Sequence, residues 1–168
     1  VLHAYAGHWG LVTGASSGIG AEFARQLAAR GMHCVLVARR EDRLGALARE
    51  LEAAHGIRCE IVSADLAQPH AGRELLAEVS RRGIELELLV NNAGFGMVTV
   101  LEETDVGRAL ELLQVNITSL TELTLLVAKA MVQRGHGGII NIGSVVSFQP
   151  VAYMAAYAAS KAYVLHFS

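Results

Sequence analysis

Short apolar runs alternate with longer amphipathic segments along the whole chain, and this alternation limits the fold more than any other feature. Five runs predict strands, over residues 9–13, 34–38, 57–62, 86–90 and 139–142. The second run, Cys-Val-Leu-Val-Ala, is apolar throughout, as expected of a strand buried on both faces. Strands that alternate with helices predict an α/β protein with a doubly wound parallel sheet, because parallel strands need crossovers that place helices on both faces.

The segments between the strands carry apolar residues at helical spacing. Ile19, Phe23 and Leu27 mark one face of the first helix. The later faces comprise Leu44, Leu47 and Leu51; Leu75, Leu76 and Val79 in a helix that Pro69 opens; Val106, Ala109, Leu110 and Leu113; and Leu120, Leu123, Val127 and Met131. Residues from Tyr153 onward are expected to be helical again. We find no repeat or linker, so we expect a single domain over residues 1–168.

Composition excludes several classes of protein. The chain has 14 Lys and Arg against 16 Asp and Glu, a net charge of −2, which argues against a nucleic-acid surface. No stretch of 18 apolar residues predicts a membrane span, and residues 1–10 do not resemble a secretory signal. Cys34 and Cys59 cannot make a disulfide scaffold, and the 7 histidines are scattered, so we expect a cytoplasmic protein without a metal site.

The first strand leads directly into Thr-Gly-Ala-Ser-Ser-Gly-Ile-Gly at residues 13–20. Gly14 permits the tight turn, Gly18 lets a pyrophosphate approach the backbone, and Gly20 allows the helix to pack closely. The N–H groups at the start of that helix would bind the phosphates. A surface turn is the alternative, but the strand before the loop and the helix after it favour a dinucleotide site.

The second strand ends at Arg39 and Arg40, where NAD-binding proteins of this kind place a carboxylate. A guanidinium binds a 2′-phosphate through charge-assisted hydrogen bonds, whereas a carboxylate would repel it. Solvated charges are the alternative, but cations are unfavourable where a helix begins. The two arginines therefore favour NADP(H).

Tyr157 and Lys161 are four residues apart near the end of the chain. Residues at this spacing share one face of a helix, so the ammonium can lie beside the phenol. A nearby cation favours the phenolate form, which suits Tyr157 to exchange a proton with a carbonyl oxygen.

Together these features make the chain similar to the short-chain dehydrogenase/reductase family. The resemblance extends from Thr13 to Lys161 and rests on motifs in the family's order. They are T-G-x-x-x-G-I-G at 13–20, Asp65-Leu66, N-N-A-G at 91–94, Asn116 in a helix, Ser144 after the fifth strand, and Y-x-x-x-K at 157–161. The 13-residue interval from Ser144 to Tyr157 also matches.

The resemblance implies a role for each catalytic residue. Tyr157 would be the general acid or base, Ser144 would hydrogen-bond the substrate oxygen, and Lys161 would hold the nicotinamide ribose. Ser147 lies close enough in sequence to compete with Ser144. Asn116 would support a water in the proton relay, and a helix kink whose side chain satisfies freed backbone groups is a compatible alternative.

The implied cofactor contacts come from all the motifs. They comprise Gly14, Ser16, Ser17, Gly18, Ile19, Gly20, Arg39, Arg40, Asp65, Leu66, Asn91, Ala93, Gly94, Tyr157 and Lys161. Among them, Asp65 would bind the adenine amino group, and Asn91 would lie by the adenosine ribose.

The expected protein is therefore an NADP(H)-dependent oxidoreductase that interconverts a carbonyl and an alcohol, as a homodimer or homotetramer. Ser147, Phe148 and Tyr153 would form one wall for a bulky apolar ketone. Relatives continue past residue 168, so we expect the domain to lack its last strands and to leave an apolar edge at 139–142. Gly143 stands where many relatives carry another Ser.

Two alternatives stay open. The first is a non-catalytic nucleotide-binding or scaffold protein that retains the fold, against which the intact Ser144, Tyr157 and Lys161 argue. The second is an epimerase or dehydratase, which fits less well because three residues separate the first two glycines of the loop instead of two.

Overall fold

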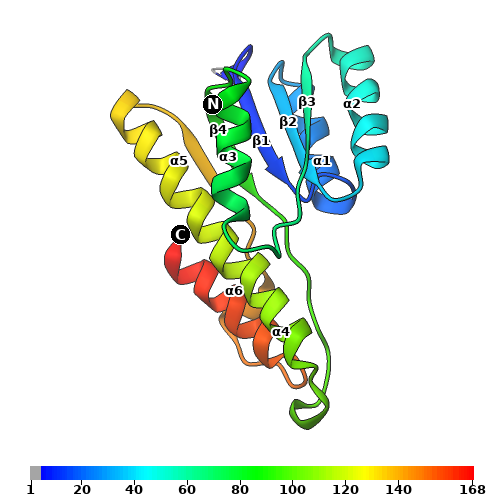
Figure 1. Ribbon diagram of the computed structural model, residues 1–168, viewed down its shortest axis with the longest axis vertical. Helices are drawn as coiled ribbons and strands as arrows, with labels where there is room; N and C mark the ends of the chain where they lie inside the picture. The colour runs from blue at the N-terminus through cyan, green and yellow to red at the C-terminus, as the bar shows by residue number, and fades with distance from the viewer. Residues whose placement is uncertain (1–4) are drawn as a thin grey trace.

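A single parallel sheet carries the helices, and its strand order fixes where a ligand can bind. The computed structural model describes residues 5–168, in which five strands form the sheet (Figure 1). The strands are β1 (Trp9–Thr13), β2 (His33–Ala38), β3 (Cys59–Ser63), β4 (Leu86–Asn91) and β5 (Gly138–Asn141). They pair in the order β3-β2-β1-β4-β5, all in parallel. The order reverses between β1 and β4, and ligands of such sheets bind outside the carboxyl ends of the strands at this point.

The predicted α/β class with a parallel sheet is thus confirmed. Four strands begin or end one or two residues away from their predicted bounds, whereas β1 has the predicted ones. Residues 1–4, which begin the segment that we expect not to be a secretory signal, lie outside the described residues.

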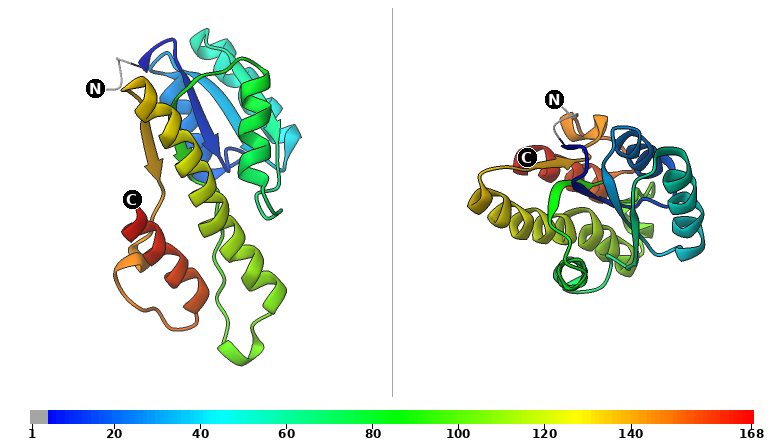
Figure 2. Two further views of the ribbon diagram at one scale, coloured as in Figure 1. Left: turned by 60° about the vertical axis from the view of Figure 1, so that its left-hand side comes forward. Right: turned by 90° about the horizontal axis from the view of Figure 1, so that it is seen from above.

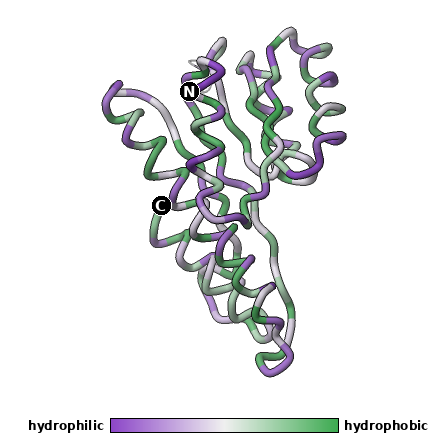
Figure 3. Tube along the Cα trace, in the orientation of Figure 1, coloured by the Kyte–Doolittle hydropathy of each residue, from purple (hydrophilic) through white to green (hydrophobic). Residues whose placement is uncertain are grey.

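Two apolar layers hold the helices against the sheet. Helices α1 (Gly18–Ala28) and α2 (Glu41–His55) cover the face that includes Leu36. Helices α3 (Ala71–Arg81) and α5 (Leu120–Arg134) cover the opposite face, around Leu89. Figure 2 shows these layers from two further sides, and Figure 3 shows hydrophobic stretches along the central strands.

Helix α1 packs only partly through the predicted face. Leu27 is buried as predicted, but Ile19 is 61% exposed and Phe23 is half-buried, whereas Gly20, Ala21 and Ala24 are buried. Small residues let the first turns of the helix approach the sheet closely, so Ile19 and Phe23 lie at the flank of the contact.

Two helices begin later than predicted because a residue before each adopts a left-handed backbone. His70, with φ 61°, precedes α3, so Pro69 lies in the preceding turn rather than in the helix. Tyr153, with φ 66°, precedes α6 (Ala155–Phe167).

Helix α4 (Val106–Leu113), a π-helical segment (η3, Gln114–Ser119) and α5 form one continuous helix that projects beyond the sheet (Figure 1). Its 29 residues are, by length and composition, the one stretch within residues 5–168 that could cross a membrane. That is weak evidence, because core helices have the same properties, and α5 packs on the sheet. The predicted core face of α4 is wrong, since Leu110 is 60% exposed and Leu112 is buried instead.

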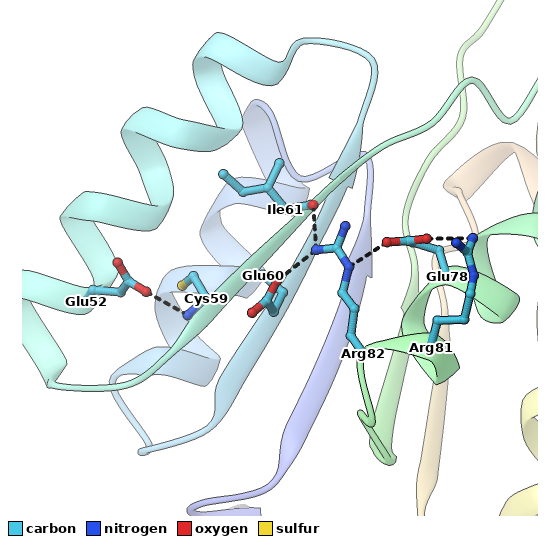
Figure 4. A network of polar contacts seen from close by, with 7 residues as sticks. All are labelled: Glu52, Cys59, Glu60, Ile61, Glu78, Arg81 and Arg82. Carbon is cyan, nitrogen blue, oxygen red and sulfur yellow. Dashed lines mark hydrogen bonds and ion pairs between the residues drawn. The ribbon is translucent and has the colours of Figure 1, made fainter.

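The outer edge of β3 is covered by charged side chains (Figure 4). Arg82, just after α3, donates hydrogen bonds to the Ile61 carbonyl (3.1 Å) and to Glu60 (2.7 Å). Glu52 of α2 accepts a hydrogen bond from the Cys59 N–H (2.9 Å). Backbone groups at this edge are thereby occupied, which prevents the strand from pairing with another chain.

Candidate active site

A cavity of about 490 Å³ opens outside the carboxyl ends of β1, β2 and β4, at the reversal in strand order. Most residues of the predicted cofactor set line it: Gly14, Ser16, Ser17, Ile19, Arg39, Arg40, Asp65, Leu66, Ala93, Gly94, Tyr157 and Lys161. Gly18, Gly20, Asn91, Asn116 and Ser144 are not among the lining residues. The motifs are scattered over 150 residues of sequence, and the fold gathers them around one cavity.

The turn between β1 and α1 has the geometry of an anion site. Gly14 adopts φ +67°, and a Cβ there would lie 2.8 Å from Nδ2 of Asn92. Gly20 sits so close to the Gly14 carbonyl that any side chain would clash with it. Gly18 has φ +55°, and a Cβ there would meet nothing within 4 Å. Among residues 5–168 no side chain caps the first N–H groups of α1, so they remain available to a phosphate.

The N-N-A-G segment is locked to this turn by two side chains. The Thr13 hydroxyl accepts hydrogen bonds from the N–H groups of Asn92 (3.0 Å) and Ala93 (2.9 Å). Nδ2 of Asn92 donates in return to the Thr13 carbonyl (2.9 Å). Asn92 therefore joins the carboxyl ends of β1 and β4, a positioning role that the sequence argument assigned to no single residue.

Arg40 reaches across from the end of β2 to the same turn. Its guanidinium donates to the hydroxyls of Ser16 (2.8 Å) and Ser17 (2.8 Å). Arg39 lines the cavity beside it, and neither arginine forms an ion pair with a carboxylate within residues 5–168. Two cations and two hydroxyls thus line the cavity, and neither cation is paired with a carboxylate within residues 5–168.

Asp65 and Leu66 border the cavity after β3. One carboxylate oxygen of Asp65 accepts a hydrogen bond from the Ala67 N–H (3.1 Å), which fixes the carboxylate at the cavity wall. The Leu66 carbonyl accepts from the buried hydroxyl of Ser119 (2.7 Å), which ties this loop to the π-helical segment.

Asn116 lies in the π-helical segment, is 1% exposed, and holds the loop that follows N-N-A-G. Its Oδ1 accepts from the Phe95 N–H (3.2 Å), and its Nδ2 donates to the Phe95 carbonyl (3.1 Å) and the Ser160 hydroxyl (3.0 Å). The side chain therefore satisfies the backbone of another loop rather than that of its own helix. π-Helical segments occur frequently at functional sites.

Tyr157 and Lys161 lie on the first two turns of α6, and both line the cavity. The half-buried Tyr157 ring packs against Gly96, where a Cβ would lie 3.6 Å from the ring. Lys161 is 6% exposed and donates from Nζ to the Ile142 carbonyl (2.7 Å). Burial lowers the pKa of Lys161 because the charged form loses its hydration. A Cβ on Gly94 would lie 2.9 Å from Oδ1 of Asn116 and 3.7 Å from Nζ of Lys161, so these three residues meet.

Two predicted residues occupy other places. The Asn91 side chain is buried and donates to Thr124 (2.9 Å) and Asn141 (2.9 Å), away from the cavity, while the adjacent Asn92 lines it. The Ser144 hydroxyl caps the short 3-10 helix η4 (Val145–Phe148) by accepting from the Val146 N–H (3.4 Å). Its neighbour Gly143 lines the cavity instead. Strand alternation explains the first difference, since Asn91 and Asn92 point to opposite sides.

Other residues contact the cavity without having been predicted. They include Phe95, Gly96, Arg108, Glu111, Val115 and Ile142. Arg108 lies over the Phe95 ring at 3.9 Å and pairs with Glu111 (2.7 Å). These residues carry no short motif, so only the fold could identify them. Residues 5–168 contain no group of three or more His, Cys, Asp or Glu side chains that could hold a metal ion.

Comparison with known proteins agrees with this geometry. The family model described as short chain dehydrogenase matches residues 8–168. The chain is 35% identical to the very-long-chain 3-oxoacyl-CoA reductase of Neurospora crassa over 166 residues, and 31% identical to the inactive hydroxysteroid dehydrogenase-like protein 1 of Homo sapiens. A solved short-chain dehydrogenase from Sphingobium yanoikuyae, in complex with NADPH, superposes with a TM-score of 0.89 at 41% identity.

These matches cover nearly all of this chain and only part of the relatives. The alignments include 96% of the chain but 50% of the Neurospora protein and 49% of the human one. The Sphingobium structure is covered to 63%, with 95% of this chain aligned. The chain thus spans about half the length of the curated relatives that it matches.

Proposed function

The chain belongs to the short chain dehydrogenase family, and from this membership we propose that it transfers a hydride between NADP(H) and a carbonyl or secondary alcohol, with Tyr157 exchanging the proton. The observation that carries the proposal is the position of Tyr157 and Lys161 at the same cavity as the glycine-rich turn and Arg40. A non-catalytic nucleotide binder would not need this convergence.

The residues around the cavity fit a phosphorylated dinucleotide. The free N–H groups that start α1 would bind the pyrophosphate, and the open space at Gly18 leaves room for it. Arg39 and Arg40, with Ser16 and Ser17, would hold a 2′-phosphate by charge-assisted hydrogen bonds. When bound, the nicotinamide would supply or accept the hydride at a carbonyl carbon.

The preference for NADP(H) over NAD(H) rests on charge. The end of β2 presents two arginines and no carboxylate, which is the arrangement expected for a 2′-phosphate rather than a free hydroxyl. The Sphingobium relative, which carries NADPH, supports the same choice. Asp65 would accept a hydrogen bond from the adenine amino group.

Tyr157 would give its proton to the carbonyl oxygen during reduction and take it back during oxidation. Lys161, held by the Ile142 carbonyl, would place its positive charge beside the phenol and stabilise the phenolate left behind. Asn116 would keep the Phe95 loop and Ser160 in place around them. Ser144 would contact the substrate oxygen only after the hydrogen bond between its hydroxyl and the Val146 N–H is broken.

We also propose that the chain forms one nucleotide-binding domain in the cytoplasm and pairs with a second copy through α5 and α6. Exposed apolar side chains on these helices, such as Leu125, Val132 and Leu165, support pairing, since apolar patches of this kind mark contact surfaces.

The non-catalytic alternative is represented among the relatives, since the human protein is named inactive. An isotope experiment separates the two. The full-length protein is incubated with NADPH deuterated at nicotinamide C4 and a panel of ketones. A hydride-transferring enzyme yields alcohol that carries one deuterium on the carbinol carbon, whereas a nucleotide-binding scaffold yields no alcohol above the protein-free control.

A further inference from the structure

A second cavity, of about 280 Å³, lies beside the one that contains Tyr157. The loop after β4 supplies Met97, Val100 and Leu101 to its lining, and the start of α6 supplies Tyr153 and Ala156. Gly96 and Tyr157, the chain neighbours of Met97 and Ala156, line the first cavity. The two linings share no residue, but they take chain neighbours from the same loop and the same helix, so the cavities lie close together on either side of these residues.

The lining of the second cavity is mainly apolar. Its one carboxylate, Glu102, is exposed and would repel an anionic group. Pockets that enclose a whole drug-sized ligand measure about 300–1,000 Å³. A cavity of about 280 Å³ is suited to one apolar part of a larger molecule whose reacting carbon lies elsewhere.

Tyr153 forms one wall of this cavity in a strained conformation. Its φ of 66° lies in the left-handed region, which glycine adopts readily and residues with a bulky side chain rarely adopt. The backbone is held there by the Thr99 N–H, which donates to the Tyr153 carbonyl (2.8 Å). The side chain is 61% exposed, so core packing does not explain the strain. Strain of this kind is concentrated at ligand sites, where it fixes a side chain for use.

We propose that the second cavity binds an unbranched hydrocarbon chain attached to the substrate carbonyl, and that Tyr153 is its specificity-determining wall. This inference rests on the proposed function, because the carbonyl would sit at the junction of the cavities, next to the Tyr157 hydroxyl. The chain would extend away from the nicotinamide between Met97 and Tyr153. Short ketones would leave the cavity partly empty.

A series of 2-alkanones from 2-butanone to 2-decanone tests the proposal in the full-length protein with NADPH. Each methylene that enters the cavity raises kcat/KM about fourfold, so three buried methylenes give about a sixtyfold rise, after which the values level off. Met97→Trp fills the cavity and Tyr153→Gly removes its wall while suiting the left-handed backbone. Each lowers the ratio of kcat/KM for 2-decanone to that for 2-butanone at least tenfold.

Phe148→Ala is the matched control. Phe148 is an exposed aromatic residue near α6 that lines neither cavity, contrary to the expectation that it forms a wall of the substrate site. This variant keeps the wild-type ratio. Turnover independent of chain length in the wild type, or an equal ratio in Met97→Trp, contradicts the proposal.

A binding measurement separates this inference from the proposed function. Isothermal titration calorimetry compares 2-decanone with 2-butanone on the NADP-loaded protein. Tighter binding of 2-decanone by at least tenfold, lost in Met97→Trp, supports the cavity even when no ketone is turned over. Equal binding of the two ketones contradicts it, whether or not the protein reduces them.

Discussion

Arg40 is the side chain that bears most directly on cofactor choice, because its guanidinium is fixed by Ser16 and Ser17 at the cavity mouth. We expect Arg40→Ala to weaken NADPH binding about tenfold or more, which corresponds to the about 1.5–3 kcal/mol of a charged hydrogen bond. NADH binding should stay within about twofold. Fluorescence titration of both cofactors gives the dissociation constants.

The control for Arg40 is Arg43→Ala. Arg43 is an exposed arginine in the first turn of α2 that does not line the cavity. It should leave both dissociation constants unchanged. An equal loss of NADPH and NADH affinity in Arg40→Ala would show that the guanidinium does not contact the 2′-phosphate.

Lys161 links stability to pH. Burial lowers its pKa below the usual 10.5, so between the folded-state and unfolded-state pKa values the unfolded chain binds more protons. Stability conferred by this group therefore rises with pH across that window, by about 1.4 kcal/mol per unit of pKa depression. The stability stops rising once the pH exceeds the pKa of Lys161 in the unfolded chain.

Lys161→Met removes this titration without adding a charge. We expect the free energy of unfolding of the cofactor-free wild type, relative to Lys161→Met, to increase between pH 7 and about pH 10. Urea unfolding at several pH values in this range measures it. A relative stability that is constant or falls with pH would mean that the folded-state pKa is not lowered.

For individual residues, the sequence predicted which ones lie around the cavity better than it predicted the orientation of each side chain. The Gly-rich turn, Arg40, Tyr157 and Lys161 were predictable because each belongs to a motif with a fixed local geometry. Asn91 points into the sheet packing, and the Ser144 hydroxyl caps a 3-10 helix. Both orientations depend on tertiary neighbours that no motif encodes.

At the scale of elements, two helical glycines offer a test of packing. A Cβ on Gly72 of α3 would lie 2.8 Å from the carboxylate of Glu122. That carboxylate also accepts a hydrogen bond from the Arg73 N–H (3.1 Å). A Cβ on Gly45 of α2 would lie 3.5 Å from the flexible end of Arg49 and 4.0 Å from Cδ1 of Ile61, both ordinary contact distances. We expect Gly45→Ala to stabilise the protein by about 0.4–1 kcal/mol.

Gly72→Ala should not show that gain, since it displaces the carboxylate that caps α3, and loss of a cap costs about 0.5–2 kcal/mol. Urea unfolding of the two variants should differ by about 1 kcal/mol or more, with Gly72→Ala the less stable. Equal stabilisation by both substitutions would mean that Glu122 does not cap α3.

The strands were predicted closely because each contains a short apolar run, and the buried face of α5 has the predicted Leu120, Leu123, Val127 and Met131. The face of α4 was not predicted correctly, and that of α1 was predicted only at Leu27. Periodicity locates large apolar residues but does not show whether they meet the sheet or lie outside it. In α1 the contact is made by Gly20, Ala21 and Ala24, and in α4 the apolar Leu110 is exposed.

The whole molecule combines a sheet that holds the nucleotide turn with a helical part, α4 to α6, that projects past its carboxyl edge (Figure 2). Tyr157 lines the cavity at the sheet's carboxyl edge and belongs to the helical part, so the proposed catalysis requires both parts to keep their relative position. Asn116 secures this junction by bonding to Phe95 on one side and Ser160 on the other.

The central claim is that Tyr157 exchanges the proton during hydride transfer from NADPH, and one comparison tests it most directly. Tyr157→Phe and Tyr163→Phe each remove one hydroxyl from α6, but that of Tyr163 bonds to Thr121 (2.8 Å) and lines neither cavity. The measurement is 2-decanone reduction by the full-length protein, followed at the nicotinamide absorbance, together with the NADPH dissociation constant. We predict that Tyr157→Phe keeps NADPH affinity within about twofold and loses about 10²–10⁴ in kcat, while Tyr163→Phe retains wild-type turnover. Near-normal turnover in Tyr157→Phe would contradict the account.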